Sequence, residues 1–405
     1  MMMRGSRLIA LVLGTTALLA WAAPPAMSRG NAPRAVDFEV ALPAARPLPT
    51  PSGWGRPAGA AHEPGAWGRP QTHAHAGQHR ARFITPVVTA QQRFDLVGVA
   101  REMRRLEIRV RAGGGAWSEW VEQVDGTPIW VDGADEVQLR APFRPDGKLH
   151  FVVVSGKGRG AGDPVEDARE KAGSALLSTA RSSAASAAAP KPKMIGRGAW
   201  GANREQGGCQ PRGAPEYGAV RSAVIHHTVS ANDYTKAEAA GIVLGICRFH
   251  VNGNGWNDIG YQALVDRFGR IYKGRAGGMR SAVVGAQAQG FNEETTAIAS
   301  IGDNRGLKLR KKARAAVARY VAWKLGVHGI DPATTTELTS GGGSLSLYPA
   351  GTVITVSRVL GHRDLGSTEC PGDSLYAQIK SIRKAVQKRA LVSGPGAGPA
   401  RPAKG

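Results

Sequence analysis

The stretch SAVIHHT, residues 222–228, is a run of β-favouring side chains that ends in two adjacent histidines. It is followed by TKAEAAGIVLGICRFHV, residues 235–251, in which apolar side chains from Ala239 to Phe249 recur at the spacing of one helix face. Alternation of an apolar strand with an amphipathic helix is typical of α/β domains. These two segments therefore predict the fold class of the surrounding chain.

The same alternation continues to about residue 390. YQALVDRFGRIYKGR (261–275) predicts two strands around a turn, and TTAIASIG (295–302) predicts another strand. KKARAAVARYVAWKLGV (311–327) predicts a long helix, and YAQIKSIRKAVQKRA (376–390) predicts a last one. We therefore expect residues 194–390 to form an α/β domain in which a mixed β-sheet is flanked by helices.

Residues 1–28 have the layout of a secretory signal peptide. Arg4 and Arg7 precede an apolar run from Leu8 to about Ala23, and small residues suited to cleavage follow. The run is shorter than the roughly 20 apolar residues that a membrane-spanning helix needs. We therefore expect an exported protein with no stable membrane anchor after cleavage of the signal.

The rest of the chain outside the α/β domain divides by composition. Residues 29–80 are rich in Pro, Gly, Ala and His, and we expect them to be disordered because such a composition buries no core. Short alternating apolar runs in residues 81–156 predict a small all-β domain with a sandwich-like fold. Residues 157–193, rich in Ala and Ser, predict a linker, and residues 391–405 a disordered tail.

The chain of 405 residues carries a formal charge of +22 and has a pI near 10.5, which indicates an anionic partner. Nucleic acid, a membrane surface and an acidic cell-wall polymer all fit this charge. The sequence has no basic–aromatic nucleic-acid motif, and an exported protein meets wall polymers more readily than DNA. Many arginines lie in Gly/Ala/Pro-rich segments, so it stays open whether part of the charge reflects composition alone.

The predicted α/β domain holds many residues of the types that bind zinc. Zinc hydrolases commonly use three protein ligands and leave the fourth position to water. One histidine of the 226–227 pair ends a predicted strand, His362 follows another, and Cys370 stands in a tight CPG turn, all positions where the backbone fixes a side chain's direction. Spacing alone does not choose among the candidates, which are His226, His227, Cys209, Cys247, His250, His328, His362 and Cys370.

Five motifs within residues 194–390 resemble those of the peptidoglycan recognition protein family, which is related to the phage T7 lysozyme-type N-acetylmuramoyl-L-alanine amidases. They are RGAWGAN (197–203), VIHHTVSAND (224–233), GWNDIGYQALVDRFGRIYKGR (255–275), GFNEETTAIASIGD (290–303) and GHRDLGSTECPGD (361–373). The matching segment covers roughly half the chain, with the motifs in the family's order. The resemblance implies the amidase-like fold of this family, and peptidoglycan, with its stem peptide and N-acetylmuramic acid, as partner.

In that family the zinc ligands are the first histidine of the HHT-like motif, the histidine of GHRD and the cysteine of CPG. They fall here on His226, His362 and Cys370. Family members without the cysteine typically bind peptidoglycan without cutting it. The resemblance therefore implies a zinc-dependent amidase that hydrolyses the amide between N-acetylmuramic acid and L-alanine, with Glu369 as one candidate for a general base that stays open. The alternative is a non-catalytic peptidoglycan-binding module.

The resemblance also implies catalytic and substrate-binding residues. The tyrosine of the DIGY motif, which polarises the scissile carbonyl or its oxyanion, falls on Tyr261, and the position two before the cysteine falls on Thr368. Gln287 stands where the family often has a groove-facing histidine. We expect Gln287, Arg275 and Asn292 to contact the substrate, and we expect a secreted, wall-associated monomer that has anionic wall polymers as further partners and no nucleic-acid partner.

The chain has three cysteines, so in an oxidising compartment at least one is left over, pairs with another molecule or binds something. If Cys370 is a metal ligand, Cys209 and Cys247 remain as a pair, and export favours joining them in a disulfide. Two separate buried thiols are the alternative, because the geometry that pairing needs is invisible in a sequence.

Overall fold

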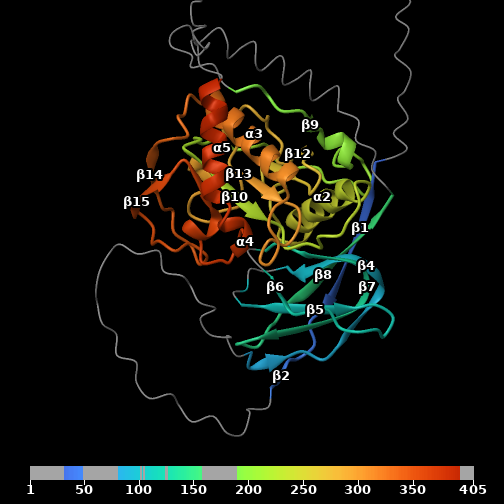
Figure 1. Ribbon diagram of the computed structural model, residues 1–405. Helices are drawn as coiled ribbons and strands as arrows, with labels where there is room; N and C mark the ends of the chain where they lie inside the picture. Colours follow the sequence, from blue (N-terminus) through green and yellow to red (C-terminus); the bar gives the residue numbers. More distant parts are fainter. Residues whose placement is uncertain are drawn as a thin grey trace, which may run out of the picture.

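The computed structural model describes residues 32–48, 81–156 and 189–392, apart from residues 101, 102, 104, 124 and 125 (Figure 1). The predicted signal peptide, most of the predicted linker and the tail from residue 393 lie outside the described residues. Among the helices of the part that is described, none is both long and apolar enough to cross a membrane.

The N-terminal part is an all-β domain, as the alternating apolar runs predict. Its strands form one continuous hydrogen-bonded sheet in the order β1-β8-β4-β7-β3-β2, with β5 paired to β6 and β7, and every pairing is antiparallel. The strands are β1 Arg34–Ala41, β2 Arg46–Pro47, β3 Phe83–Ile84, β4 Val88–Val99, β5 Glu107–Arg111, β6 Val121–Glu122, β7 Ile129–Ala141 and β8 Lys148–Ser155.

The prediction of disorder for residues 29–80 is wrong at β1. This strand pairs with β8 along its whole length, and the ring of Phe38 stacks on that of Phe151 with centroids 4.8 Å apart. The local sequence VDFEV alternates apolar and polar residues at the period of a strand. The Pro- and Gly-rich composition of the longer window hides this short alternation.

The C-terminal part is the predicted α/β domain. Its six-stranded sheet has the order β16-β10-β13-β11-β12-β9, in which β10 runs parallel to β13 and β16 whereas β11 and β12 are antiparallel. The strands are β9 Met194–Ile195, β10 Ser222–His227, β11 Ala263–Val265, β12 Ile271–Lys273, β13 Thr295–Ser300 and β16 Val359–Gly361, and a separate hairpin joins β14 Thr335–Thr339 to β15 Val353–Ser357. The mixed sheet is confirmed.

Helices cover both faces of this sheet (Figure 1). Ile225 and Ile298 face the apolar layer formed with α3 and α5, and Ala297 and Ala299 face the layer formed with α2. The helices are α2 Ala239–Arg248, α3 Lys311–Val327, α4 Asp373–Tyr376 and α5 Ile379–Val392, and the short helical turns are η2 Arg197–Trp200, η3 Phe249–Gly253, η4 Asn292–Glu294 and η5 His362–Asp364.

α2 lies beside β1 and β8 of the β domain (Figure 1). The two domains share one apolar core around this helix. Leu96, Trp130 and Val152 of the β domain are buried in the same cluster as the side chains of α2. Gly245 permits this approach, because a Cβ atom there would lie only 2.3 Å from Cδ1 of Leu96. The β domain is therefore packed directly against the helix that follows β10.

Candidate functional site

The fold brings two predicted ligands together at the carboxyl ends of neighbouring parallel strands. In the register of β10 and β16, Ile225 is paired with Gly361. His226 and His362 each follow one member of this pair, so both histidines leave the sheet at the same edge. Ligand sites form at such edges because the strand ends fix the side chains' directions. Cys370 reaches the same point from the turn that follows η5.

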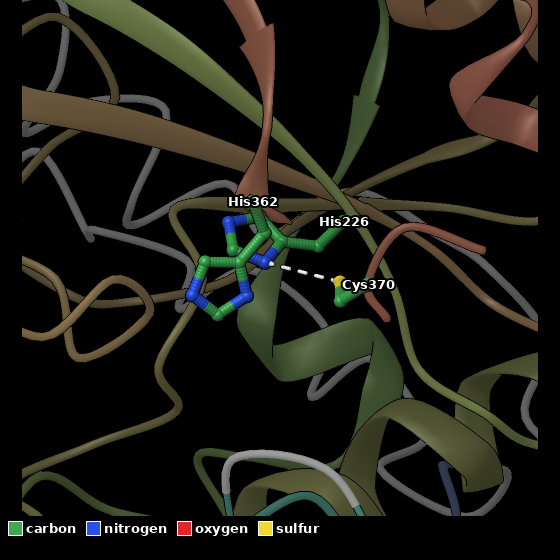
Figure 2. Close-up of side chains that lie close together, drawn as sticks. All are labelled: His226, His362 and Cys370. Atoms are coloured by element: carbon green, nitrogen blue, oxygen red, sulfur yellow. Dashed lines mark hydrogen bonds between the residues drawn. The ribbon is translucent and has the colours of Figure 1, made fainter. Parts of the chain in front are cut away.

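The three side chains form a compact group of possible metal donors (Figure 2). Nδ1 of His226 lies 3.6 Å from Sγ of Cys370, and one donor atom from each of the three residues lies within 4.8 Å of the others. Their exposed fractions are 1% for His226, 3% for His362 and 3% for Cys370. Nitrogen and sulfur ligands of one tetrahedral zinc ion are about 3.5 Å apart, given bond lengths of about 2.0–2.1 and 2.3 Å. The donor set therefore fits zinc.

A directed hydrogen-bond chain sets the orientation of His226. The Thr295 hydroxyl donates to the Phe291 carbonyl oxygen at 2.7 Å, so its oxygen accepts from Nε2 of Gln287 at 2.8 Å. Oε1 of Gln287 then faces Nε2 of His226 at 2.6 Å. Nε2 consequently carries the ring proton, and Nδ1, which faces Cys370, keeps its lone pair for a metal. Burial, and then the neighbouring His362, hold the pKa of His226 well below its usual range, which favours this neutral form.

Gln287 has contacts that the sequence does not indicate. The residue does line the cavity beside the donor group, but its amide oxygen and nitrogen are engaged by His226 and Thr295. The amide nitrogen has a second N–H group, so a contact between Gln287 and the substrate stays a prediction beside these two bonds. Gln287 is a residue that orients a candidate metal ligand.

Two contacts hold the Cys370 turn. The Thr368 hydroxyl oxygen accepts a hydrogen bond from the Cys370 backbone N–H at 3.1 Å, and the His227 backbone N–H points at the Cys370 sulfur at 3.4 Å. The second of these contacts ties the sulfur to the end of β10. Thr368 is half-buried and is not among the residues found to line the cavity, so the contact that the structure gives it is with the cysteine turn.

A cavity of about 200 Å³ opens beside the donor group. Tyr261, in the loop before β11, lines it with a hydroxyl-bearing ring that is only 5% exposed and lies 5.3 Å from the His226 ring, centroid to centroid. The other lining residues that bear on the chemistry are Thr127, Trp256, Gln287, Asn292, His226, His362 and Cys370. The cavity therefore combines three metal donors with a buried phenol.

The other two predicted substrate contacts differ from each other. Asn292 lines the cavity, but its side-chain oxygen accepts the backbone N–H groups of Gln287 and Ala288 at 2.8 and 2.9 Å. Arg275 is not among the lining residues, and its guanidinium donates to the Ile259 carbonyl oxygen at 3.2 Å. The guanidinium of Arg275 faces the main chain of a neighbouring loop, and a contact between Arg275 and the substrate stays a prediction.

The other five candidate zinc ligands do not belong to the group formed by His226, His362 and Cys370. Nδ1 of His227 accepts the Asn304 backbone N–H at 3.1 Å, and Nδ1 of His250 accepts that of Gly260 at 3.1 Å. Burial, and then the charge of Arg275, lower the pKa of His250 to about 3. His328 lies at the end of α3. Cys209 and Cys247 are bonded to each other, with the sulfurs 2.08 Å apart.

The lining residue Thr127 comes from outside the domain that carries the sequence motifs. Thr127 belongs to the β domain, in the segment before β7, and nothing in the surrounding sequence TPIW marks it as part of a site. Trp256, in contrast, lies in the GWNDIGY motif that also carries Tyr261.

Comparison with known proteins yields solved structures, sequence relatives and a family model. The structure of wild-type Drosophila PGRP-LB matches with a TM-score of 0.36 and 29% identity, covering 47% of this chain and 93% of that one. The amidase LysC from Clostridium intestinale matches with a TM-score of 0.33 and 22% identity, covering 47% and 97% of the two chains.

The sequence comparison is more specific. Peptidoglycan-recognition protein SC2 of Drosophila melanogaster is 29% identical over 160 residues, 39% of this chain and 72% of the relative. Peptidoglycan-recognition protein LB of the same species is 29% identical over 190 residues, 47% of this chain and 68% of the relative. The family model described as N-acetylmuramoyl-L-alanine amidase matches residues 216–373. From residue 216 to residue 373 the chain thus carries a domain of the family that unites N-acetylmuramoyl-L-alanine amidases with peptidoglycan recognition proteins.

Proposed function

We propose that this protein is a zinc-dependent N-acetylmuramoyl-L-alanine amidase that hydrolyses the amide between N-acetylmuramic acid and L-alanine in peptidoglycan. The observation that carries the proposal is the position of Cys370, whose sulfur lies 3.6 Å from Nδ1 of His226 beside a cavity that His362 also lines. Two imidazoles and one thiolate are a donor set of the kind that catalytic zinc sites use, with one position left for water. The family of residues 216–373 supports the reaction class.

Zinc held by His226, His362 and Cys370 would supply Lewis-acid polarisation of the scissile carbonyl and a bound water with a pKa near neutrality. The protein would supply the rest. Gln287 holds His226 in the tautomer that presents Nδ1, and the Cys370 turn is held by the backbone N–H of His227. The Tyr261 hydroxyl, at the cavity wall, would donate to the oxygen on which charge develops, a contact worth about 3–4 kcal/mol in other hydrolases.

Peptidoglycan is the proposed substrate because the relatives are named for its recognition. Export to the cell wall is part of the same proposal. It is supported by the signal-peptide layout of residues 1–28, which lie outside the described residues, and by the Cys209–Cys247 disulfide, since such bonds persist in oxidising compartments. Anionic wall polymers and a monomeric state stay predictions.

The names of these relatives also favour a second candidate, a module that binds peptidoglycan without cleaving it. Digestion of purified sacculi distinguishes the two. The amidase predicts new free amino groups on L-alanine, loss of that release when zinc is chelated, and its return when zinc is added back. Binding to sacculi with no alanine released at any zinc concentration would establish the binding module instead.

A further inference from the structure

The cavity beside the metal donors is built by two domains. Thr127 of the β domain lines it, and the Thr127 hydroxyl lies 3.2 Å from the Tyr261 hydroxyl, at a sequence separation of 134 residues. Both side chains are 5% exposed. A hydrogen bond sheltered from water in this way has a defined geometry and does not exchange freely with solvent partners.

The segment that carries Thr127 is held against the amidase domain by its neighbours. Nδ2 of Asn254, which directly follows η3, donates to the Gly126 carbonyl oxygen at 2.8 Å. Gly126 has a φ of +66°, and a Cβ atom there would lie 2.7 Å from Nδ2 of Asn254. Glycine is therefore required for the close approach that brings Thr127 to the cavity.

The apolar core that the two domains share also fixes the position of Thr127 relative to Tyr261. Trp130, three residues after Thr127, is buried in the cluster that contains Tyr261 and the side chains of α2. At the far end of α2, Nε of Arg248 donates to the Asp37 carboxylate at 3.0 Å, which ties β1 to the same helix. The position of Thr127 relative to Tyr261 thus follows from an extended interface and not from one hydrogen bond alone.

The chemistry of the two hydroxyls suggests what the contact does. A phenol has one proton and can also accept a hydrogen bond. If the Thr127 hydroxyl donates to the Tyr261 oxygen, the tyrosine proton is left to point at another acceptor, and the cavity is where a substrate carbonyl would lie. Without that donor the phenol loses a contact that sets the orientation of its hydroxyl.

The geometry points to an active site completed by the N-terminal β domain, in which Thr127 is a positioning residue that donates to Tyr261 and directs the tyrosine proton into the cavity. This inference rests on the proposed amidase function. It assigns to the β domain a part in the site that is independent of any wall-binding role.

The test is a double-mutant cycle in the full chain with a soluble muramyl peptide as substrate. Thr127→Val keeps the shape and removes the hydroxyl, so we expect kcat to fall about 3- to 10-fold with KM nearly unchanged, the size of one lost hydrogen bond. Thr127→Ser should retain most of the activity. In the Tyr261→Phe background, Thr127→Val should cause no further loss, because the oxygen that it serves is gone.

A matched control distinguishes the effect of the Thr127–Tyr261 contact from the effect of a weaker interface between the two domains. Asp37→Asn weakens the interface at the Arg248 end of α2 without touching the cavity, so it should lower the unfolding temperature and leave kcat unchanged. Zinc content should be the same in all variants. If Thr127→Val does not fold, Thr127→Ala takes its place with the same expected results.

Three outcomes would overturn the inference. The first is a Thr127→Val enzyme with wild-type kcat. The second is a cycle in which the effects of Thr127→Val and Tyr261→Phe simply add, and the third is an Asp37→Asn variant that loses as much kcat as Thr127→Val. A wild-type chain that cleaves no muramyl peptide would overturn the proposed function as well. The wild-type measurement in the same assay shows this independently of the variants.

Discussion

The side-chain oxygen of Gln287 lies 2.6 Å from Nε2 of His226, on the ring nitrogen opposite the one that faces Cys370. The sequence comparison of motifs places at this position a residue that faces the substrate groove. The structure gives Gln287 a further contact that fixes the tautomer of His226, because the Thr295 hydroxyl sets the orientation of the Gln287 amide. This contact bears directly on metal binding, because it orients a candidate metal ligand.

Gln287→Leu should therefore weaken zinc binding by about 10- to 100-fold, since removal of a partner that orients a ligating histidine typically has an effect of this size. The measurement is zinc affinity by competition with a chromophoric chelator. Gln289→Leu is the matched control, because Gln289 lines the same cavity but its side-chain oxygen accepts the Leu345 backbone N–H. Equal zinc affinity for the Gln287 variant and wild type would contradict the role.

Cys370→Ala should lose most of the bound zinc, from about one ion per chain, because it deletes one of three protein ligands. Elemental analysis of the dialysed protein measures this. The two adjacent histidines provide an internal comparison. His226→Ala should lose zinc in the same way, whereas His227→Ala should keep more, since Nδ1 of His227 faces the Asn304 backbone N–H. A Cys370→Ala protein with wild-type zinc content would remove the cysteine from the site.

Tyr261→Phe should fold, bind zinc and lose about 100-fold or more in kcat, the size of effect seen when one oxyanion donor is removed. The ring stays in place to fill the shared core, but the buried Thr127 hydroxyl loses this partner, so the unfolding temperature should fall modestly. Steady-state kinetics on a muramyl peptide, together with zinc analysis, check the two halves of this expectation. Unchanged kcat would exclude the hydroxyl from the reaction.

The denatured, metal-free protein should show one free thiol, that of Cys370, because Cys209 and Cys247 are bonded to each other. Titration with a thiol reagent before and after reduction counts them. The bond closes a loop with a sequence separation of 38, so its removal should cost about 3–4 kcal/mol of stability on the chain-entropy model. Three free thiols in the unreduced protein would show that the bond does not form.

Glu122 should make stability depend on pH. Burial, followed by the charge of the nearby Glu369, raises its pKa from 4.5 to about 7, against the opposing effects of the Arg105 backbone N–H and the Arg305 charge. A raised pKa means that the folded state holds the proton more tightly. The stabilisation is therefore complete below about pH 4.5 and is lost as the pH rises through about 7.

Glu122→Gln stays uncharged at every pH, so its unfolding temperature should equal that of wild type near pH 4.5, exceed it increasingly up to about pH 7 and exceed it by a constant amount at higher pH. Thermal unfolding across pH 4.5 to 8.5, flanking the two pKa values, measures the difference. Glu119→Gln, an exposed substitution in the same domain, is the control for charge alone. A constant offset between variant and wild type at all pH values would contradict the expectation.

Local pattern was sufficient for most of the secondary structure. The alternation in SAVIHHT and the helical spacing that follows it correspond to β10 and α2, and the predicted helix at 311–327 is α3. These elements depend on side chains a few positions apart, which one short window contains. The sequence did not predict β1, because composition averaged over a Pro- and Gly-rich window conceals a strand of eight residues. Its pairing partner β8 is also more than a hundred residues away in the chain.

By itself the sequence determined the α/β class, the order of the motifs and a set of eight candidate ligands, among which the family resemblance singled out His226, His362 and Cys370. Only the tertiary structure shows these three meeting, because that depends on the register of β10 against β16, a contact between segments about 136 residues apart, as in Ala223 and Val359. The tertiary structure also decided that Gln287 bonds His226, that Arg275 bonds a main-chain carbonyl group, and that a threonine of the β domain reaches Tyr261. Each of these is a contact between side chains distant in sequence, and no local spacing encodes the packing of two domains on one helix.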